Sequence, residues 1–327
     1  MNIPIGRGDI AALFKNCLDE KKIAQSYIIH GPSGMGKKTV MEYILSLVMC
    51  EFGSSCGVCS SCKSLEMNAH PDVVVLKRPE DKASIGVDVV RSAISQVYIK
   101  PVLAGYKAVV VHEAHLLTVE AQNAMLKIIE EPPERVVFFL LCDTVSPILQ
   151  TVISRSVTVN LRPLSIDELK TITDGKAHDF ELNYCMGNPG KLKEIISDEE
   201  FLSLRNDVIN KFVKIASDDA FCVYEAVQFL DKNKEARDEI FALLLLFARD
   251  ALYKKLGMDS LVINTDKINE INAFKSKATA KSLLKIMRII LNTQIQKGKN
   301  GNFTIAVTTM LFKCREELDG RSNRNSF

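Results

Sequence analysis

The chain has 327 residues, with 42 basic and 40 acidic side chains and a formal net charge of +2. A chain of this length is expected to form two or three domains, because single cores stop growing at about 250 to 300 residues. The near-neutral balance excludes a general attraction to nucleic acid, so any DNA contact has to be local. The longest apolar run, at residues 241–248, is too short for a membrane span of about 20 residues.

The N-terminus and the cysteines indicate the compartment. Residues 1–4 have neither the basic nor the apolar region of a secretory signal, so we expect a cytoplasmic protein with no membrane segment. Nine cysteines, four of them within thirteen residues, favour a reduced compartment and a metal site over a disulfide framework. The other five lie in apolar or helical contexts and are expected to be buried small residues: Cys17, Cys142, Cys185, Cys222 and Cys314.

The first 160 residues alternate short apolar runs with helical patterns, which is typical of a parallel β-sheet covered by helices. The predicted strands are rich in Val, Ile and Phe and lie at 26–30, 72–76, 107–111, 135–142 and 156–161. Helices are expected at about 37–50, around 87–97, and from the N-cap Thr118 to just before Pro132.

After Leu161 the pattern becomes helical. Ser165, with Glu168 three residues later, forms a capping-box signature that opens a short helix. A Gly-Asn-Pro-Gly turn leads into another helix near residue 191, and residues 241–256 are apolar on most sides, as in the centre of a helical bundle. The tail at 319–327 is polar and is expected to fray. We predict three domains: a core at 1–162 with an inserted module at 50–62, a small helical domain at 163–205, and an all-helical domain at 206–327.

A phosphate-binding loop, Gly31-Pro32-Ser33-Gly34-Met35-Gly36-Lys37, follows the first predicted strand and opens a helix. The glycines let backbone N–H groups converge on a phosphate, and Lys37 supplies positive charge. A complete motif continues with Ser or Thr, whose hydroxyl binds Mg²⁺, but this chain has Lys38 there, and Thr39 points elsewhere on the helix. The sequence therefore predicts a degenerate loop, with a plain glycine turn as the alternative. Its candidate nucleotide-binding residues are Gly31, Gly34, Gly36 and Lys37.

The second half of such a site is altered too. Four apolar residues at 108–111 are followed by His112, where a magnesium-binding aspartate is expected, and then by Glu113. Histidine is a poor ligand for a hard cation that prefers oxygen, although Glu113 stands where a carboxylate could polarise water. Two lost magnesium ligands predict absent or very slow ATP hydrolysis and leave ATP or ADP binding open. Alternatively, His112, Glu113 and His115 merely form a polar loop at the end of a strand. For His115 we prefer this interpretation.

Four cysteines, Cys50, Cys56, Cys59 and Cys62, form the pattern C-x5-C-x2-C-x2-C. Cysteines with two residues between them can place two thiolates on one tetrahedral Zn²⁺. Because all four ligands are thiols, no position stays open for water, so we expect a structural zinc ion. Free surface thiols are the alternative.

Residues 121–133, Ala-Gln-Asn-Ala-Met-Leu-Lys-Ile-Ile-Glu-Glu-Pro-Pro, closely resemble the helix and turn shared by bacterial DNA polymerase III clamp-loader subunits of the AAA+ family. The family pattern is Ala-x-Asn-Ala-Leu-Leu-Lys, then Leu-Glu-Glu-Pro-Pro. The cysteine module also fits, as does Ser154-Arg155-Ser156, where the family has Ser-Arg-Cys. The resemblance covers roughly the first 200 residues, and the rest matches only in helical character.

The resemblance implies an α/β AAA+ P-loop core with a parallel sheet, a small helical lid and an all-α collar that assembles a pentamer. Two members of the family carry zinc, the gamma/tau motor and the delta-prime type. The motor needs the threonine and aspartate that Lys38 and His112 replace, so the delta-prime type fits better. The resemblance also implies partners: gamma/tau and delta subunits in a hetero-pentamer, a sliding clamp, and primed DNA reached through the complex.

The resemblance further implies a catalytic role in trans for Arg155. In the family this arginine projects into the ATP site of the neighbouring subunit, where a guanidinium neutralises charge on the transferring phosphoryl group. Ser156 departs from the family's cysteine, and a plain surface arginine is the alternative. Thr144 and Lys191 lie near the family's sensor 1 and sensor 2 positions.

Three functions therefore compete: a non-hydrolysing stator, a gamma/tau-type ATPase with an atypical magnesium site, and a zinc-dependent DNA-binding module. Residues 264–315 carry ten basic and two acidic side chains, a local excess of eight positive charges. Such a stretch can approach DNA phosphate or an acidic partner within a Debye length, and a solvated helix face is the preferred interpretation.

Overall fold

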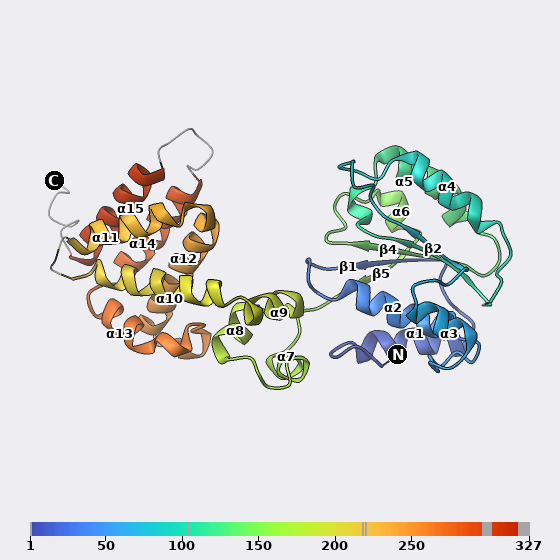
Figure 1. Cartoon of the computed structure of the whole chain (residues 1–327), viewed down its shortest axis with the longest axis horizontal. Coiled ribbons are helices and arrows are strands. Elements are labelled where there is room, and N and C mark those ends of the chain that lie inside the picture. Colours follow the sequence, from blue (N-terminus) through green and yellow to red (C-terminus); the bar gives the residue numbers. More distant parts are fainter. Residues whose placement is uncertain (1, 104, 218, 220, 296–302, 320–327) are drawn as a thin grey trace. The chain divides into compact units, whose positions relative to one another are not determined.

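The computed structural model describes the chain except for residues 1, 104, 218, 220, 296–302 and 320–327 (Figure 1). Most of the predicted polar tail therefore lies outside the described residues. Two compact units are present: unit one comprises Met1–Gly175 with Met186–Lys191, and unit two comprises Lys176–Cys185 with Leu192–Phe327. Within the described part of the chain, no helix has the length and apolarity needed to cross a membrane.

Unit one is built on a five-stranded sheet in which every neighbouring pair is parallel, in the order β2-β3-β4-β1-β5. The predicted strands are confirmed to within one residue at each end. Their bounds are β1 (Ser26–His30), β2 (Val73–Leu76), β3 (Lys107–Val111), β4 (Val136–Cys142) and β5 (Val157–Asn160). Every residue of β3 and β4 is buried, because interior parallel strands are covered on both faces.

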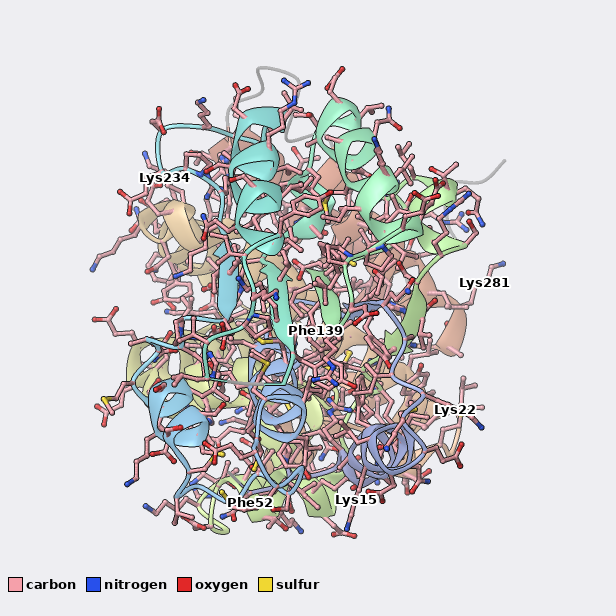
Figure 2. The ribbon with its side chains drawn as sticks, turned by 90° about the vertical axis from the view of Figure 1, so that its right-hand side faces the viewer. Lys15, Lys22, Phe52, Phe139, Lys234 and Lys281 are labelled. Carbon is pink, nitrogen blue, oxygen red and sulfur yellow. The ribbon has the colours of Figure 1, made fainter. Side chains whose placement is uncertain are left out.

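One apolar core lies on each face of this sheet, and Figure 1 shows helices over both faces. Successive side chains of a strand point to opposite faces, so Phe139 of β4 belongs to one core and Phe138 to the other. Phe139 is fully buried and lies in the middle of the view in Figure 2. The first core is covered by α1 (Gly8–Asp19) and α2 (Lys37–Val48), and the second by α4 (Val87–Val97), α5 (Val119–Glu130) and α6 (Gln150–Ile153). This arrangement confirms the predicted α/β fold class.

Capping residues begin the helices where the sequence places them. Thr118 Oγ1 accepts a hydrogen bond from the Ala121 N–H and opens α5, which ends at Glu130 before the two prolines. Ser165 and Glu168 form the predicted capping box of α7 (Ile166–Ile172). Hydrogen bonds from Arg162 and from the Ser165 N–H lower the pKa of Glu168 to about 2, so the carboxylate stays charged at neutral pH and holds the cap.

Unit two is helical throughout its described residues. Its helices are α8 (Asp179–Tyr184), α10 (Glu199–Lys214), α11 (Phe221–Lys232), α12 (Arg237–Lys255), α13 (Ile268–Ser276), α14 (Ala280–Ile295) and α15 (Phe303–Leu318), while α9 (Pro189–Ser197) begins in unit one. The apolar helix α12 packs against α10, α13 and α14, which confirms it as the centre of the bundle. Residue 205, where the sequence places a domain boundary, lies inside α10, because the Asp198 cap starts one continuous helix.

Three of the five cysteines expected to be buried, Cys142, Cys185 and Cys314, are buried. The prediction is wrong for Cys17 and Cys222, which are only half-buried. Both lie on helices that keep one side in solvent, a property that apolar context alone does not reveal.

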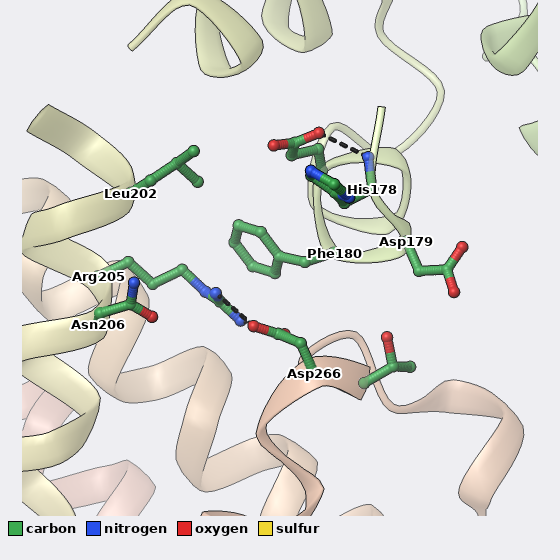
Figure 3. Close-up of a pocket in the computed structure, with 9 residues that line it drawn as sticks. His178, Asp179, Phe180, Leu202, Arg205, Asn206 and Asp266 are labelled. Carbon is green, nitrogen blue, oxygen red and sulfur yellow. Dashed lines mark hydrogen bonds and ion pairs between the residues drawn. The ribbon is translucent and has the colours of Figure 1, made fainter. Parts of the chain in front are cut away.

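A polar cluster centred on the buried Arg205 joins α8, α10 and the segment before α13 (Figure 3). The Arg205 side chain, 4% exposed, donates to both carboxylate oxygens of Asp266 at 2.6 and 2.9 Å and to Asn264 Oδ1 at 2.8 Å. Its guanidinium carbon lies 3.4 Å from the ring centroid of Phe180. Burial alone raises the pKa of Asp266, but the hydrogen bonds and charge of Arg205 outweigh burial and leave it lowered. Arg205 therefore ties three segments of unit two together.

We expect Arg205→Met to lower the free energy of unfolding by about 2 kcal/mol, because the buried Asn264 Oδ1 loses its donor and Asp266 loses a bidentate partner. Chemical denaturation of the full chain measures this. The control, Lys254→Met, removes the exposed pair with Asp259 and is expected to cost less than about 1 kcal/mol. Equal losses in the two variants would show that Arg205 does not hold unit two together.

Candidate functional site

The carboxyl ends of β1, β3 and β4 meet at one edge of the sheet. His30, the last residue of β1, pairs with Cys142 of β4, and Val111 of β3 pairs with Leu140. The phosphate-binding loop, Asp143 and His112 each follow directly after one of these strands. Parallel register therefore brings together, at one edge, residues that are far apart in the sequence.

The loop adopts a conformation that needs its glycines. Gly34 and Gly36 have φ of +83° and +82°, in the left-handed region that side chains rarely adopt. A Cβ on Gly34 would also lie 2.5 Å from Asn188 Oδ1. Gly36 forms the N-cap of α2, so backbone N–H groups at the start of this helix point toward the loop.

Lys37 is held inside the loop by three acceptors. Its Nζ donates to Gly31 O at 2.6 Å, to Pro32 O at 3.0 Å and to Asp143 Oδ1 at 2.6 Å. An ammonium group has three donors, so these contacts use its whole hydrogen-bonding capacity. A phosphate can therefore accept a hydrogen bond from Lys37 only by displacing one of these partners. Asp143 also adds a negative charge that repels an incoming anion.

Two segments outside the motif brace the loop. Asn188 Nδ2 donates to Ser33 O at 2.7 Å, and the Gly190 N–H donates to Gly34 O at 2.9 Å. The buried Arg7 donates from Nη2 to Met35 O at 3.1 Å and from Nη1 to Arg162 O at 2.6 Å. The loop is thus fixed by contacts that do not require a nucleotide.

Neither position that lost a magnesium ligand supplies an oxygen. Lys38 Nζ lies 3.7 Å from Glu42 Oε1, and Thr39 is exposed. Burial, with the nearby charges of Lys77 and Lys38, lowers the pKa of His112, so its imidazole is neutral at neutral pH. Two of these side chains, Lys38 and His112, line a cavity of about 620 Å³ together with Glu113.

Arg155 lies outside the loop, on the segment between α6 and β5. Its Nε lies 2.8 Å from Glu130 Oε1, at the end of α5, and its Nη1 donates to Thr151 O at 3.0 Å. The neighbouring Ser156 places its hydroxyl 2.8 Å from the Ser26 hydroxyl of β1. The guanidinium is therefore oriented by Glu130 while its side chain stays 41% exposed.

The four cysteines of the inserted module lie within reach of one ion. Their sulfur atoms all lie within 4.8 Å of one another, and tetrahedral zinc with Zn–S bonds of about 2.3 Å spaces sulfurs about 3.8 Å apart. The Cys59 N–H donates to Cys56 Sγ and the Cys62 N–H donates to Cys59 Sγ, both at 3.4 Å. Such bonds stabilise thiolates, so the donor set fits a structural zinc ion.

The thiols differ in acidity. Burial raises the pKa of Cys50, but backbone N–H groups of Cys56, Ser54 and Phe52 outweigh it and lower the pKa to about 6. Burial and the neighbouring thiols raise the pKa of Cys62 to about 12. Thiolate and thiol therefore coexist at neutral pH before a metal binds, and a bound cation would displace the remaining proton.

A series of buried hydrogen bonds connects the cysteine module to the residues before β2. The Asp72 N–H donates to His70 Nδ1, so Nε2 carries the proton and donates to Ser61 Oγ at 2.7 Å. The Ser61 hydroxyl donates in turn to Met49 O, next to Cys50, at 2.6 Å. These hydrogen bonds hold α3 (Ser60–Glu66) against the start of β2. Phe52, at the tip of the module, remains exposed (Figure 2).

Comparisons with known proteins agree with this architecture. Residues 6–165 match the family model described as DNA polymerase III, delta subunit, and residues 199–316 match the model for the C-terminal part of that same subunit. The delta-prime subunit of Pseudomonas aeruginosa is 35% identical over 137 residues, which is 41% of this chain and 42% of that protein. The chain belongs to the delta-prime-type clamp-loader family of DNA polymerase III.

Other relatives of this delta-prime-type chain are gamma/tau proteins. The gamma/tau subunit of Mycobacterium tuberculosis is 35% identical over 156 residues, which is 46% of this chain and 27% of that protein. The chain thus spans less than half the length of the curated relatives it matches. A solved gamma subunit-related protein from Thermotoga maritima is similar over 94% of this chain and 99% of its own, with 19% identity and a TM-score of 0.45.

The contacts around the loop of this delta-prime-type protein include residues that sequence analysis missed. Asp143 follows directly after a strand, which is the one sequence signal that could have pointed to it. Asn188 lies in a turn whose sequence predicts only that a helix follows. Arg7 belongs to no motif, so nothing in the sequence indicates that it contacts the loop. The structure places Thr144 beside Asp143, where its Oγ1 accepts a hydrogen bond from the Ser146 N–H. The backbone N–H of Lys191 donates to Asn188 Oδ1.

We expect one zinc ion per chain in protein prepared without chelator, measured by elemental analysis. Cys59→Ser is expected to lose the metal and to lower the unfolding temperature by about 5 °C, because the module then lacks one of its four zinc ligands. Cys17→Ser, the control, alters a half-buried thiol outside the module and keeps the metal. Absence of zinc from the unaltered protein would contradict the assignment.

We expect Asp143→Asn to bind ADP about three to ten times more tightly than the unaltered chain, because it frees Lys37 and removes a repelling charge. Calorimetry without Mg²⁺ measures the affinity. Asp19→Asn removes an equal charge away from the loop and is expected to change nothing. An unchanged affinity in Asp143→Asn would mean that the Lys37–Asp143 pair does not limit binding.

Proposed function

We propose that the chain is the stator of a DNA polymerase III clamp loader and does not hydrolyse ATP itself. In this role it assembles with gamma/tau and delta subunits in a hetero-pentamer and helps to load a sliding clamp onto primed DNA. One observation carries the proposal: the phosphate loop and parallel sheet are intact, yet Lys38 and His112 occupy both magnesium-binding positions. A cation and a neutral imidazole cannot replace the hard oxygen ligands that Mg²⁺ requires.

The proposal assigns Arg155 to the ATP site of a neighbouring subunit. Glu130 holds Nε and Thr151 O accepts from Nη1, and among the described residues Nη2 makes no hydrogen bond. A guanidinium held at one end and open at the other is suited to reach a phosphoryl group on another chain. None of its contacts within the described part of unit one is with the chain's own phosphate loop, which also favours action in trans.

The cysteine module has a structural role in this proposal. A zinc ion bound by Cys50, Cys56, Cys59 and Cys62 would close a loop that otherwise has a very small apolar core. The ion has no open position for water and takes part in no reaction step. Its effect is to order α3. Because His70 is hydrogen-bonded both to Ser61 of α3 and to Asp72, the ion would also help to order the start of β2.

The basic stretch at 264–315 is not assigned to DNA. Its described residues lie on and around α13, α14 and α15, and residues 296–302 are outside the described part. Lys285 pairs with Glu317 at 3.0 Å, and Lys267 lies 3.6 Å from Glu270. Lysines that are half-buried and already paired with carboxylates are less available to DNA phosphate, so we do not favour the zinc-dependent DNA-binding module.

We expect Arg155→Ala to lower the DNA- and clamp-stimulated ATPase of a reconstituted clamp loader by about tenfold or more, because the neighbouring site loses its charge-neutralising group. Arg155→Lys is expected to recover little of the stimulated ATPase activity that Arg155→Ala loses, because an ammonium group lacks the planar pair of donors of a guanidinium. The control is Arg91→Ala, an exposed arginine of α4.

Assembly of the complex, followed by gel filtration, separates this effect from a folding defect. We expect all three variants to enter the complex normally. Normal stimulated ATPase in fully assembled Arg155→Ala complexes would overturn the role of this residue.

A further inference from the structure

The cavity of about 620 Å³, named the β2 pocket here, belongs to neither the phosphate loop nor the cysteine cluster. It lies between α2, α3 and the strands β2 and β3, within unit one. Its floor consists of aliphatic and methionine side chains, Met41, Leu45, Leu65, Val73, Val75 and Val110. A cavity of this size and composition accommodates several apolar side chains or a small ligand.

The strand beside this pocket has an open edge. β2 is the first strand in the sheet order and pairs only with β3 among the described residues. Asp72 O and Leu76 O accept from the N–H groups of Ala108 and His112, both at 2.9 Å, so even-numbered residues of β2 face β3. Backbone groups alternate sides along a strand, so the N–H and C=O of Val75 point to the free edge. The Val75 side chain is 47% exposed at the pocket.

Positive side chains gather at the end of β2. Lys77 and Arg78 follow this strand, and both line the β2 pocket together with Lys38 and the neutral His112, which follows β3. Two acidic residues also line it, and each already faces a cation: Glu42 lies 3.7 Å from Lys38 Nζ, and Glu113 lies 3.7 Å from Arg78 Nε. Lys77 has no ion pair with any described residue. The end of the pocket therefore has an uncompensated positive charge.

Arg78 adds a donor that lacks an acceptor. Its Nη1 donates to Lys82 O at 2.7 Å, but its Nε is buried and makes no hydrogen bond to any described residue. The nearest carboxylate oxygen, on Glu113, lies at 3.7 Å, which is beyond hydrogen-bond length. A buried donor without an acceptor is costly, so an acceptor entering the pocket would be stabilised there.

We propose that the β2 pocket binds an extended segment of a partner protein that presents two aliphatic side chains and one acidic side chain on the same face. The segment adds to the free edge of β2 through the backbone of Val75, a known mode of peptide recognition. Its aliphatic side chains cover the floor of the pocket. Its carboxylate lies between Lys77 and the unpaired Nε of Arg78. The site shares Lys38 and His112 with the altered magnesium positions, but it uses no residue of the phosphate loop or the zinc cluster and does not involve Arg155, so it can be tested separately from the stator role.

The charge of His112 provides an internal probe of this site. Burial and the positive charges of Lys77 and Lys38 lower its pKa, while Glu113 opposes them. A carboxylate bound beside Lys77 offsets that positive charge and raises the pKa of His112. The ring resonances of His112 in an NMR titration therefore report an anion in the pocket directly.

The test uses the full chain and two fluorescein-labelled peptides, Thr-Val-Thr-Val-Thr-Glu-Thr and its reversed sequence, which cover both strand directions. Matched peptides carry Lys in place of Glu. Fluorescence anisotropy is measured for the unaltered chain, for Lys77→Glu, and for the control Lys15→Glu, which alters an exposed lysine of α1 outside the pocket (Figure 2).

We expect one Glu peptide to bind the unaltered chain about tenfold more tightly than its Lys counterpart, and Lys77→Glu to reverse that order. Lys15→Glu is expected to keep the original order. Bound peptide is expected to slow hydrogen exchange at the Val75 amide and to raise the pKa of His112. Equal affinity for Glu and Lys peptides, no binding at about 1 mM, or an unprotected Val75 amide would each overturn the proposal.

Discussion

The register between β1 and β4 is the constraint on which the site depends. Pairing of His30 with Cys142 places Asp143 directly beside the phosphate loop, where it accepts from Lys37 at 2.6 Å. Because β4 is buried on both faces, a slip of one residue would move Phe138 and Phe139 each into the other's core, where the packing does not match them. The hydrophobic core of the sheet therefore fixes an ion pair at its edge. That ion pair holds the lysine which, in a working nucleotide site, would bind phosphate.

A loop closed in this way has a structural role even without nucleotide. Arg7 and Asn188 attach the N-terminal segment and the turn before α9 to the loop backbone, so the loop organises unit one around itself. These contacts involve neither Lys38 nor His112, so they do not depend on a magnesium site. The same two positions, Lys38 and His112, line the β2 pocket. In the proposed stator this surface holds no magnesium and is available for another ligand.

Local rules predicted a large part of the fold. The five strands follow from short β-branched and aromatic runs, and α5 and α7 begin at residues whose side chains cap a helix. The phosphate loop and the four thiols were found because their spacing is set by local chemistry. Arg7 and Asn188 were missed because their partners lie 28 to 155 residues away. Arg205 was missed for the same reason, since Asp266 is 61 residues distant and no local pattern marks such a pair.

We propose that this chain cannot hold a metal–nucleotide pair for cleavage, and Mg²⁺-dependent ATP turnover by the isolated chain is the sharpest test. Lys37→Ala, which lacks the phosphate-binding ammonium, sets the background. We expect the unaltered chain and Lys37→Ala to release phosphate at the same rate, with or without Mg²⁺. Turnover by the unaltered chain that exceeds the Lys37→Ala rate and requires Mg²⁺ would contradict this expectation.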